Sequence, residues 1–268
     1  MKGEASRKVD ILIPTFERPG ALAVTLAGLV GQTFRGFAVI VSDQSDWDTA
    51  ATGEVAAVVR VLRARGHEVQ LHRHVPPRGM AEHRQFLLDQ AVAPYVLFLD
   101  DDVLLEPDVL ERMVAALEQE GCGFGGCGLI GLTYAAAVRP HEQQVEFWDG
   151  PVRPEDVSPG TPAWDRHKLH NAANLLHLQS SMGREGDRKY KVAWIGGCVL
   201  YDREKLIDCG GFSFWPELPH DHAGEDVLAQ LRVMRRYGGF GLLPSGAYHL
   251  ELPTTLPIRT VDAPELLH

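Results

Sequence analysis

The first hundred residues alternate between short apolar runs, typical of strands, and segments with the apolar periodicity of helices. Strands are predicted at 9–13, 37–41, 68–74 and 95–99, and helices at 21–31, 53–65 and 80–91. Strands joined through helices pair in parallel with right-handed crossovers. The sequence therefore predicts a Rossmann-like α/β fold, with a mainly parallel central sheet flanked by helices. Pro14 is expected to stop the first strand.

Three carboxylates, Asp100, Asp101 and Asp102, directly follow the fourth predicted strand. In open α/β sheets, ligands bind at the carboxyl ends of the strands. Adjacent carboxylates repel one another, and a hard cation such as Mg²⁺ or Mn²⁺, which brings phosphates with it, relieves that repulsion. The alternative is a solvated acidic turn that leads into a helix predicted from Glu106 to Gln119. The strand context favours a metal–phosphate site.

The usual glycine-rich phosphate motifs are absent from the sequence. No GxGxxG follows the first predicted strand, and no GxxxxGK[ST] occurs. The phosphates of a bound nucleotide would therefore need another partner, and the acidic triplet with a metal ion is the substitute that the sequence offers.

Composition excludes several classes of function. The chain has 268 residues and a formal net charge of −10, which argues against nucleic-acid or anionic-membrane binding. No apolar run approaches the ~20 residues that span a bilayer, and residues 1–7 lack the apolar centre of a signal peptide, so a cytoplasmic protein is expected. No CxxC pair occurs, and the four cysteines are predicted to be structural thiols rather than zinc ligands.

The second half is less regular. A buried strand is predicted at 129–132 and another at 191–201, with helices from 202 and from 225 to about 237. Residues 139–191 are rich in proline and look helical only at 169–181; such a long irregular stretch is usually functional or mobile. Trp148 and Trp164 in this stretch are candidates for stacking on a sugar or for anchoring the loop. The tail 253–268 is expected to wrap or to be mobile, and a role as a lid stays open.

Several motifs, in order, resemble those of a family-2 glycosyltransferase of the GT-A fold. The first strand ends in Ile-Pro-Thr-Phe-Glu-Arg, the second in Val-Ser-Asp-Gln-Ser-Asp, and the fourth in Phe-Leu-Asp-Asp-Asp. Later matches are Trp194-Ile195-Gly196-Gly197 and Glu225-Asp226. The resemblance implies a single GT-A domain, with a nucleotide-sugar-binding half at 9–120 and an acceptor-binding half at 121–252 that contains the variable segment 139–191.

The resemblance also implies roles in donor binding. The loop after the first strand would line the nucleotide through Pro14, Thr15, Glu17 and Arg18. Asp43 would accept a hydrogen bond from the base, and a turn-forming role is its alternative. Arg78 would lie near the base and the diphosphate; Arg84 is the other candidate, and a solvated cation at a helix start is the alternative for both.

In the triplet, the family pattern implies that Asp100 binds the ribose and Asp102 binds the metal, and it leaves both roles open for Asp101. His249 is a further candidate metal ligand, with a structural histidine as the alternative. Of the Glu225–Asp226 pair, Asp226 is the expected general base, and Glu225 would orient the acceptor. Acids at a helix start also favour the helix dipole, which is the structural alternative.

The function predicted from this resemblance is a metal-dependent, inverting hexosyl or related transferase that uses Mn²⁺ or Mg²⁺. The donor would be a nucleotide-diphosphate sugar, and the acceptor a glycan, a lipid-linked sugar, a peptide or a small natural product. One alternative is an inactive binding protein with the same fold. The other is a nucleotidyltransferase, which would need a Gly-rich loop with Lys or Arg after the first strand; here that loop has one glycine, Gly20, and no lysine. The Gln-x-x-Arg-Trp motif of processive synthases is absent, which favours single addition.

Overall fold

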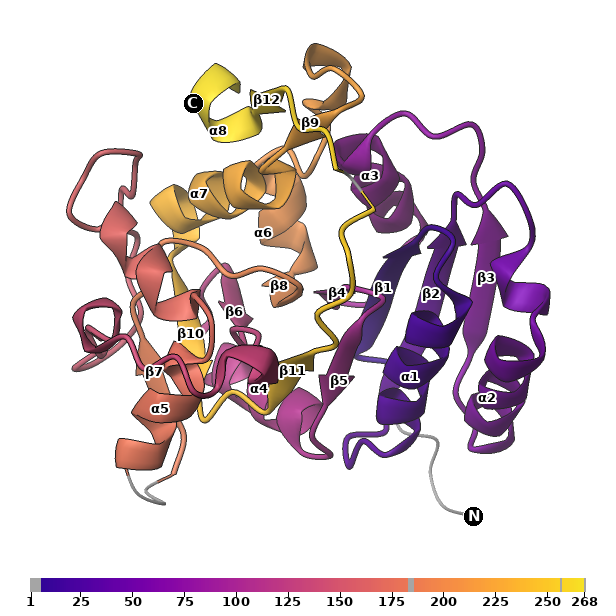
Figure 1. Cartoon of the computed structure of the whole chain (residues 1–268), viewed down its shortest axis with the longest axis horizontal. Helices are drawn as coiled ribbons and strands as arrows, with labels where there is room; N and C mark the ends of the chain where they lie inside the picture. The colour runs from indigo at the N-terminus through magenta and orange to yellow at the C-terminus, as the bar shows by residue number, and fades with distance from the viewer. Residues whose placement is uncertain (1–5, 183–185, 256, 268) are drawn as a thin grey trace.

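A computed structural model describes residues 6–182, 186–255 and 257–267 (Figure 1). Its main sheet has eight strands in the order β3-β2-β1-β4-β8-β6-β10-β7. These strands are β1 (Val9–Thr15), β2 (Phe37–Asp43), β3 (Val69–Arg73), β4 (Tyr95–Leu99), β6 (Phe124–Gly126), β7 (Arg188–Tyr190), β8 (Cys198–Asp202) and β10 (Gly239–Leu243). Four of the seven strand pairings are parallel, and β8 and β7 run against the rest.

The helices connect the strands and cover both faces of the sheet. They are α1 (Pro19–Val30), α2 (Gly53–Ala64), α3 (Met80–Gln90), α4 (Val109–Glu120), α5 (Asn174–Ser181), α6 (Arg203–Asp208), α7 (Glu225–Tyr237) and α8 (Ala263–Leu267). Short 3-10 helices are η1 (Thr49–Ala51), η2 (Leu132–Tyr134), η3 (Pro140–Glu142), η4 (Trp164–His170) and η5 (Trp215–Glu217).

The first half confirms the predicted fold class. The strands and helices predicted up to residue 99 are present, with ends within two residues of those expected. The prediction that Pro14 stops the first strand is wrong, because β1 continues to Thr15 and Pro14 pairs with Ser42 of β2. The pairing of β1 with β4 ends at Leu12, so the missing N–H of Pro14 breaks no bond to that strand.

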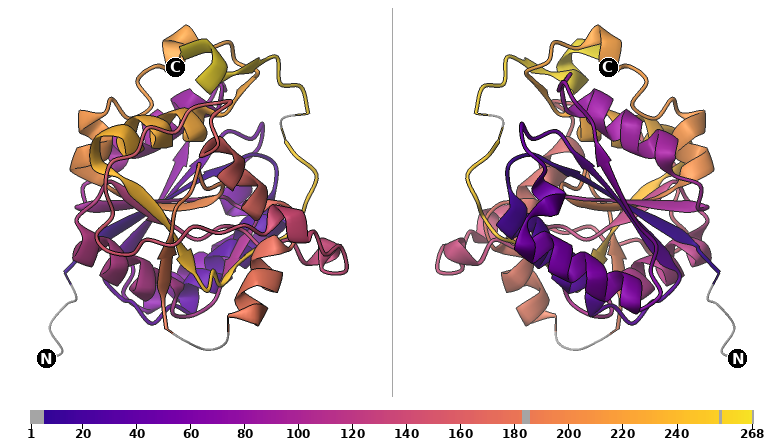
Figure 2. Two further views of the ribbon diagram at one scale, coloured as in Figure 1. Left: turned by 90° about the vertical axis from the view of Figure 1, so that its left-hand side faces the viewer. Right: turned by 90° about the vertical axis from the view of Figure 1, so that its right-hand side faces the viewer.

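The two faces of the sheet each carry an apolar core, because side chains alternate along every strand. In β1, Ile11 and Ile13 join a core with α1, α2 and α4, whereas Leu12 joins a second core with α3, α6 and α7. Figure 2 shows α1 and α2 on one face of the sheet and α3 on the other. This two-sided burial explains why the strands read as continuous apolar runs.

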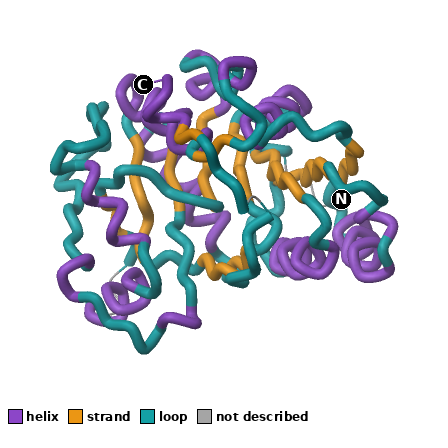
Figure 3. Tube along the Cα trace, turned by 45° about the horizontal axis from the view of Figure 1, so that its top comes forward, coloured by secondary structure: helices purple, strands orange, loops and turns teal. Residues whose placement is uncertain are grey.

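The second half departs from the prediction in several places. The strand expected at 129–132 is wrong: β6 lies at Phe124–Gly126, and Ile130 forms only a single bridge with Tyr248. The reason is packing, since a Cβ on Gly125 would lie 2.5 Å from the ring of Phe240. Only residues 198–201 of the run predicted at 191–201 form a strand, as part of β8, and residues 191–197 lie outside any strand. The helix predicted at 169–181 begins at Asn174, and the helix predicted from Glu106 begins at Val109. Loops dominate this half, seen at the left of Figure 3.

Two small ribbons complete the fold. β5 (Val103–Leu105) pairs antiparallel with β11 (Ala247–His249), and β9 (His222–Ala223) pairs with β12 (Val261–Asp262). The C-terminal segment wraps over the sheet edge between these ribbons, past the ends of β4 and β1 (Figure 1), and ends in α8.

Within the described residues, Cys122, Cys127 and Cys198 are buried free thiols, and Cys209 is half-buried. Burial raises the pKa of both Cys122 and Cys127 to about 12, so these thiols remain protonated at neutral pH. None of the helices in the described part of the chain has both the length and the apolar character that crossing a membrane requires.

Candidate active site

The loop after β1 meets the aspartate triplet after β4, because the two strands are parallel neighbours. The Thr15 hydroxyl donates a 2.6 Å hydrogen bond to Asp101 Oδ2. The Arg18 guanidinium lies 2.9 Å from Asp102 Oδ2 and 3.5 Å from Asp101 Oδ1. Residues that the sequence placed in one site by resemblance are therefore in direct contact.

The two buried acids of this cluster differ in pKa. Burial raises the pKa of Asp101 to about 6, although the hydrogen bond from Thr15 acts to lower it. Burial also opposes ionisation of Asp102, but the hydrogen bond and charge of His249 and the charge of Arg18 outweigh it, and the pKa of Asp102 is lowered. Both carboxylates are therefore mainly ionised at neutral pH, but Asp102 keeps its charge to lower pH than Asp101 does, which suits a cation ligand.

The ribbon of β5 and β11 brings His249 to the triplet. His249 pairs with Val103, directly after Asp102, and the Leu250 N–H donates to the Asp102 carbonyl at 2.8 Å. The His249 Nε2 atom consequently lies 3.3 Å from Asp102 Oδ2, and the hydrogen bond to Asp102 raises the pKa of His249. β5 was not predicted from the sequence, since a three-residue strand has no periodic pattern to detect.

Asp43 organises the loop that follows β2. Its Oδ1 accepts a 2.9 Å hydrogen bond from the Ser45 N–H and a second from the Ser45 hydroxyl, and its Oδ2 accepts from the Thr49 N–H at 2.9 Å. This geometry supports the turn-forming alternative. A carboxylate oxygen can accept two hydrogen bonds, so Oδ2 retains room for one further donor.

Three further predicted residues lie near the carboxyl ends of the strands without joining the acidic cluster. Arg78 is exposed in the loop before α3 and forms no hydrogen bond or ion pair within the part of the chain that the structure describes. Glu17 is exposed at a positive φ of 54°, and its N–H donates to the Ser45 hydroxyl at 2.7 Å. Pro14 is buried inside β1.

The Glu225–Asp226 pair begins α7 and faces the triplet from the other half of the chain. Arg84 of α3 joins them: its Nε lies 2.9 Å from Glu225 Oε1, and its Nη2 lies 3.4 Å from Asp100 Oδ1. The alternative of a solvated helix-start cation is wrong for Arg84, because only 6% of this residue is exposed.

Asp226 has the properties of a proton acceptor near neutral pH. Burial, with the charge of Glu225, raises the pKa of Asp226 to about 7. Its carboxylate has no side-chain hydrogen-bond donor among the described residues, so the oxygens are available to a ligand. A base with a pKa close to the working pH is efficient in proton transfer.

Sequence reasoning missed the contribution of the C-terminal segment. The Arg18 guanidinium also donates to the Pro253 carbonyl, so the segment after β11 is bonded to the loop after β1. The tail lacks a periodic pattern, and no signal in the sequence pointed to this contact.

A comparison with curated protein sequences gives no significant match. The family model described as "Glycosyl transferase family 2" matches residues 10–155, which is more than half of the chain. The chain belongs to glycosyl transferase family 2.

Solved glycosyltransferase structures share the GT-A fold of this family-2 chain. Staphylococcus aureus TarS with UDP-GlcNAc has a TM-score of 0.59 at 15% identity and covers 93% of this chain and 60% of its own. The mannosyltransferase PcManGT of Pyrobaculum calidifontis with GDP-Man and Mn²⁺ has a TM-score of 0.57 at 18% identity, and the match covers 94% of this chain and 59% of PcManGT. GalNAc-T7 with UDP, GalNAc and Mn²⁺ has a TM-score of 0.61 at 14% identity, and the match covers 92% of this chain and 44% of GalNAc-T7. The chain thus spans 60% or less of each of these proteins.

One glycine of the family-2 site is constrained by its neighbours. Gly197 has φ of 72°, its carbonyl accepts from the Asp100 N–H at 2.9 Å, and a Cβ here would lie 2.5 Å from Leu129 and 3.0 Å from Asp100 Oδ2. We expect Gly197→Ala to lower the free energy of unfolding by about 1–3 kcal/mol, the scale of a strained backbone conformation. Urea denaturation measures this change.

Gly196→Ala is the matched control, because a Cβ there would meet only Trp194, at 3.9 Å. Equal effects of the two substitutions would contradict a specific constraint at Gly197.

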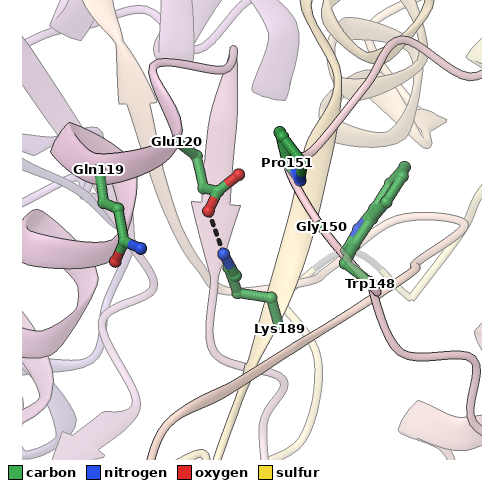
Figure 4. A pocket seen from close by; sticks show the side chains of 6 residues that line it. All are labelled: Gln119, Glu120, Trp148, Gly150, Pro151 and Lys189. Carbon is green, nitrogen blue, oxygen red and sulfur yellow. Dashed lines mark hydrogen bonds and ion pairs between the residues drawn. The ribbon is translucent and has the colours of Figure 1, made fainter.

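A separate hollow lies away from this candidate site, beside β7 (Figure 4). The sheet order places β7 four strands from β4, roughly 19 Å at the usual strand spacing. Glu120 and Lys189 in the hollow form an ion pair with each other, and Trp148 packs against the core and under Lys191. Trp164 likewise packs against the second core, so both tryptophans have anchoring contacts.

Proposed function

We propose that this chain transfers a sugar from a nucleoside-diphosphate sugar to an acceptor hydroxyl, with inversion at the anomeric carbon. The observation that carries the proposal is the convergence of two acidic motifs: the triplet after β4 and the Glu225–Asp226 pair share the Arg84 guanidinium. The UDP-GlcNAc and GDP-Man in two of the similar structures support a donor of this chemical class. The acceptor class stays open among glycans, lipid-linked sugars, peptides and small natural products.

The donor-binding half in this proposal is 9–120. Asp43 Oδ2 has capacity for one more donor, such as a base N–H, and Asp100, directly after β4, would contact the ribose. Arg78 is an exposed cation near this site without a partner among the described residues, and therefore a better candidate for the diphosphate than the buried Arg84. The acceptor would be bound by the half at 121–252.

The fold family implies a divalent cation, and Asp102 with His249 fits it as a pair of ligands. The described residues contain no group of three His, Cys, Asp or Glu side chains arranged for a metal ion. Mg²⁺ and Mn²⁺ suit such a site because they commonly take one or two protein ligands and fill the rest with phosphate oxygens and water. A bound cation would supply charge that stabilises the departing nucleoside diphosphate.

Asp226 would act as the general base. As the acceptor oxygen forms its bond to the anomeric carbon, the proton of the hydroxyl moves to the Asp226 carboxylate. The bond between that carbon and the diphosphate breaks, and its electron pair leaves with the nucleoside diphosphate. Attack opposite to the leaving group inverts the configuration, and no covalent enzyme intermediate is required.

The donor site is tested by titration calorimetry with UDP and GDP, each with and without Mn²⁺. We expect one nucleotide to bind in a Mn²⁺-dependent manner. Asp102→Ala should weaken that binding by about tenfold or more, because a contact to a charged group is lost.

The matched control for Asp102→Ala is Asp108→Ala, which removes an exposed carboxylate at the start of α4 and should leave binding unchanged. If UDP, GDP, TDP, ADP and CDP all fail to bind with the metal present, the donor site is wrong. The alternative of an inactive binding protein would then be favoured.

A further inference from the structure

Arg84 is a fully buried cation set between carboxylates from the two halves of the chain. Its side chain is 7% exposed, as is that of Glu225. Its Nε donates to Glu225 Oε1 at 2.9 Å, its Nη2 reaches Asp100 Oδ1 at 3.4 Å, and its guanidinium lies 5.6 Å from the centroid of the Phe98 ring. Fixed donors in a planar fork hold two acceptors in one relative geometry, which a lysine ammonium does not do.

The helix that carries Arg84 is itself tied to the segment that leads into Glu225. The Ala81 N–H, at the start of α3, donates to His222 Nε2 at 3.1 Å, and Gln85 Oε1 accepts from the Phe212 N–H at 2.9 Å. α3 therefore bonds to the chain on either side of Arg84, and the guanidinium has a defined position relative to α7.

We propose that Arg84 is a positioning residue, which fixes the acceptor-side Glu225–Asp226 pair against the donor-side Asp100 instead of contacting the donor phosphates. The proposal rests on the glycosyltransferase function proposed above. It assigns to the buried Arg84 a role distinct from that of the exposed Arg78.

The charges around Asp226 give this role a measurable signature. Glu225 on its own helix and Asp100 after β4 raise the pKa of Asp226, and Arg84 from α3 lowers it. The remaining groups nearby are Tyr201 of β8, whose own pKa burial raises, and Asp262 of β12, which interacts with Glu225. Removing the Arg84 charge should therefore raise the pKa of Asp226, and removing the Glu225 charge should lower it.

The test is the pH dependence of kcat in Arg84→Gln, Arg84→Lys and Glu225→Gln, with Arg235→Gln as control at an exposed arginine of α7. In Arg84→Gln we expect the acid limb to move up by about 1 pH unit or more, the scale of losing a neighbouring opposite charge. The ratio of variant to wild-type kcat would then be about tenfold lower at pH 6 than at high pH, where Asp226 is ionised in both. Arg84→Lys keeps the charge, so its limb should stay in place, and Glu225→Gln should move the limb down.

Nucleotide affinity separates this role from phosphate binding. We expect the calorimetric Kd for the nucleotide in Arg84→Gln to stay within about twofold of wild type. A Kd raised by tenfold or more, or an acid limb that does not move, would overturn the proposal. If Arg84→Gln does not fold, the proposal is judged on the two other variants. It then requires that the acid limb of the kcat–pH profile moves down in Glu225→Gln and stays in place in Arg84→Lys.

Failure of the proposed function is a different outcome, namely no turnover by the wild-type chain with any donor. The Asp226 pKa is then read without turnover, from a ¹³C NMR titration of the aspartate carboxyl carbons that is assigned with Asp226→Asn. The same upward shift in Arg84→Gln supports the positioning role, and no shift refutes it.

Discussion

Asp226→Asn is expected to lower kcat by about 10²–10⁴-fold, the usual contribution of a general base. The amide keeps the shape of the carboxylate but cannot accept the hydroxyl proton. In the wild-type chain, kcat should rise with pH through about 7, because burial and Glu225 raise the pKa of Asp226 and only its ionised form accepts a proton. Steady-state rates between pH 5 and 9 measure both effects.

Asp221→Asn is the matched control, since it makes the same substitution just before β9 and leaves α7 intact. Nucleotide binding should be unchanged in both variants. A fully active Asp226→Asn chain would exclude Asp226 as the base and leave Glu225 as the candidate.

Arg84→Met is expected to lower the free energy of unfolding by about 3–5 kcal/mol, the cost of leaving a buried charge without its partner. Glu225 would lose its only side-chain ion-pair partner among the described residues, and Asp100 would lose the nearest opposite charge. Chemical denaturation at pH 7 measures the loss.

Arg235→Met provides the comparison, because Arg235 pairs with Asp156 while 51% of its side chain is exposed, and exposed pairs contribute about 0–1 kcal/mol. The double variant Arg84→Met/Glu225→Met should recover part of the stability, since the buried Glu225 carboxylate is then no longer left without its partner. Similar losses in Arg84→Met and Arg235→Met would show that the buried cluster does not depend on Arg84.

The sequence predicted the first half of the fold closely, because β1, β2 and β4 are buried on both faces and β3 alternates between buried and more exposed residues. Periodicity reports such burial directly. It failed at β6 and at 129–132, where the glycines carry no pattern of their own and the packing of Phe240 on Gly125 decides the position of the strand.

The residue types of the site were also visible in the sequence, since a carboxylate triplet after a buried strand has few structural uses. Their partners were not visible. Arg78 and Arg84 are only six positions apart, and the packing of α3 against α7 buries Arg84 while Arg78, in the loop before α3, stays exposed.

Local apolar patterns thus encode the strand–helix alternation and, with it, the end of the sheet at which the acids gather. The tertiary structure decided the pairing of Asp102 with His249, the link from Arg84 to Glu225 and the contact of Arg18 with Pro253. These contacts join residues far apart in the chain, and their geometry depends on how strands and helices pack, which no local pattern records.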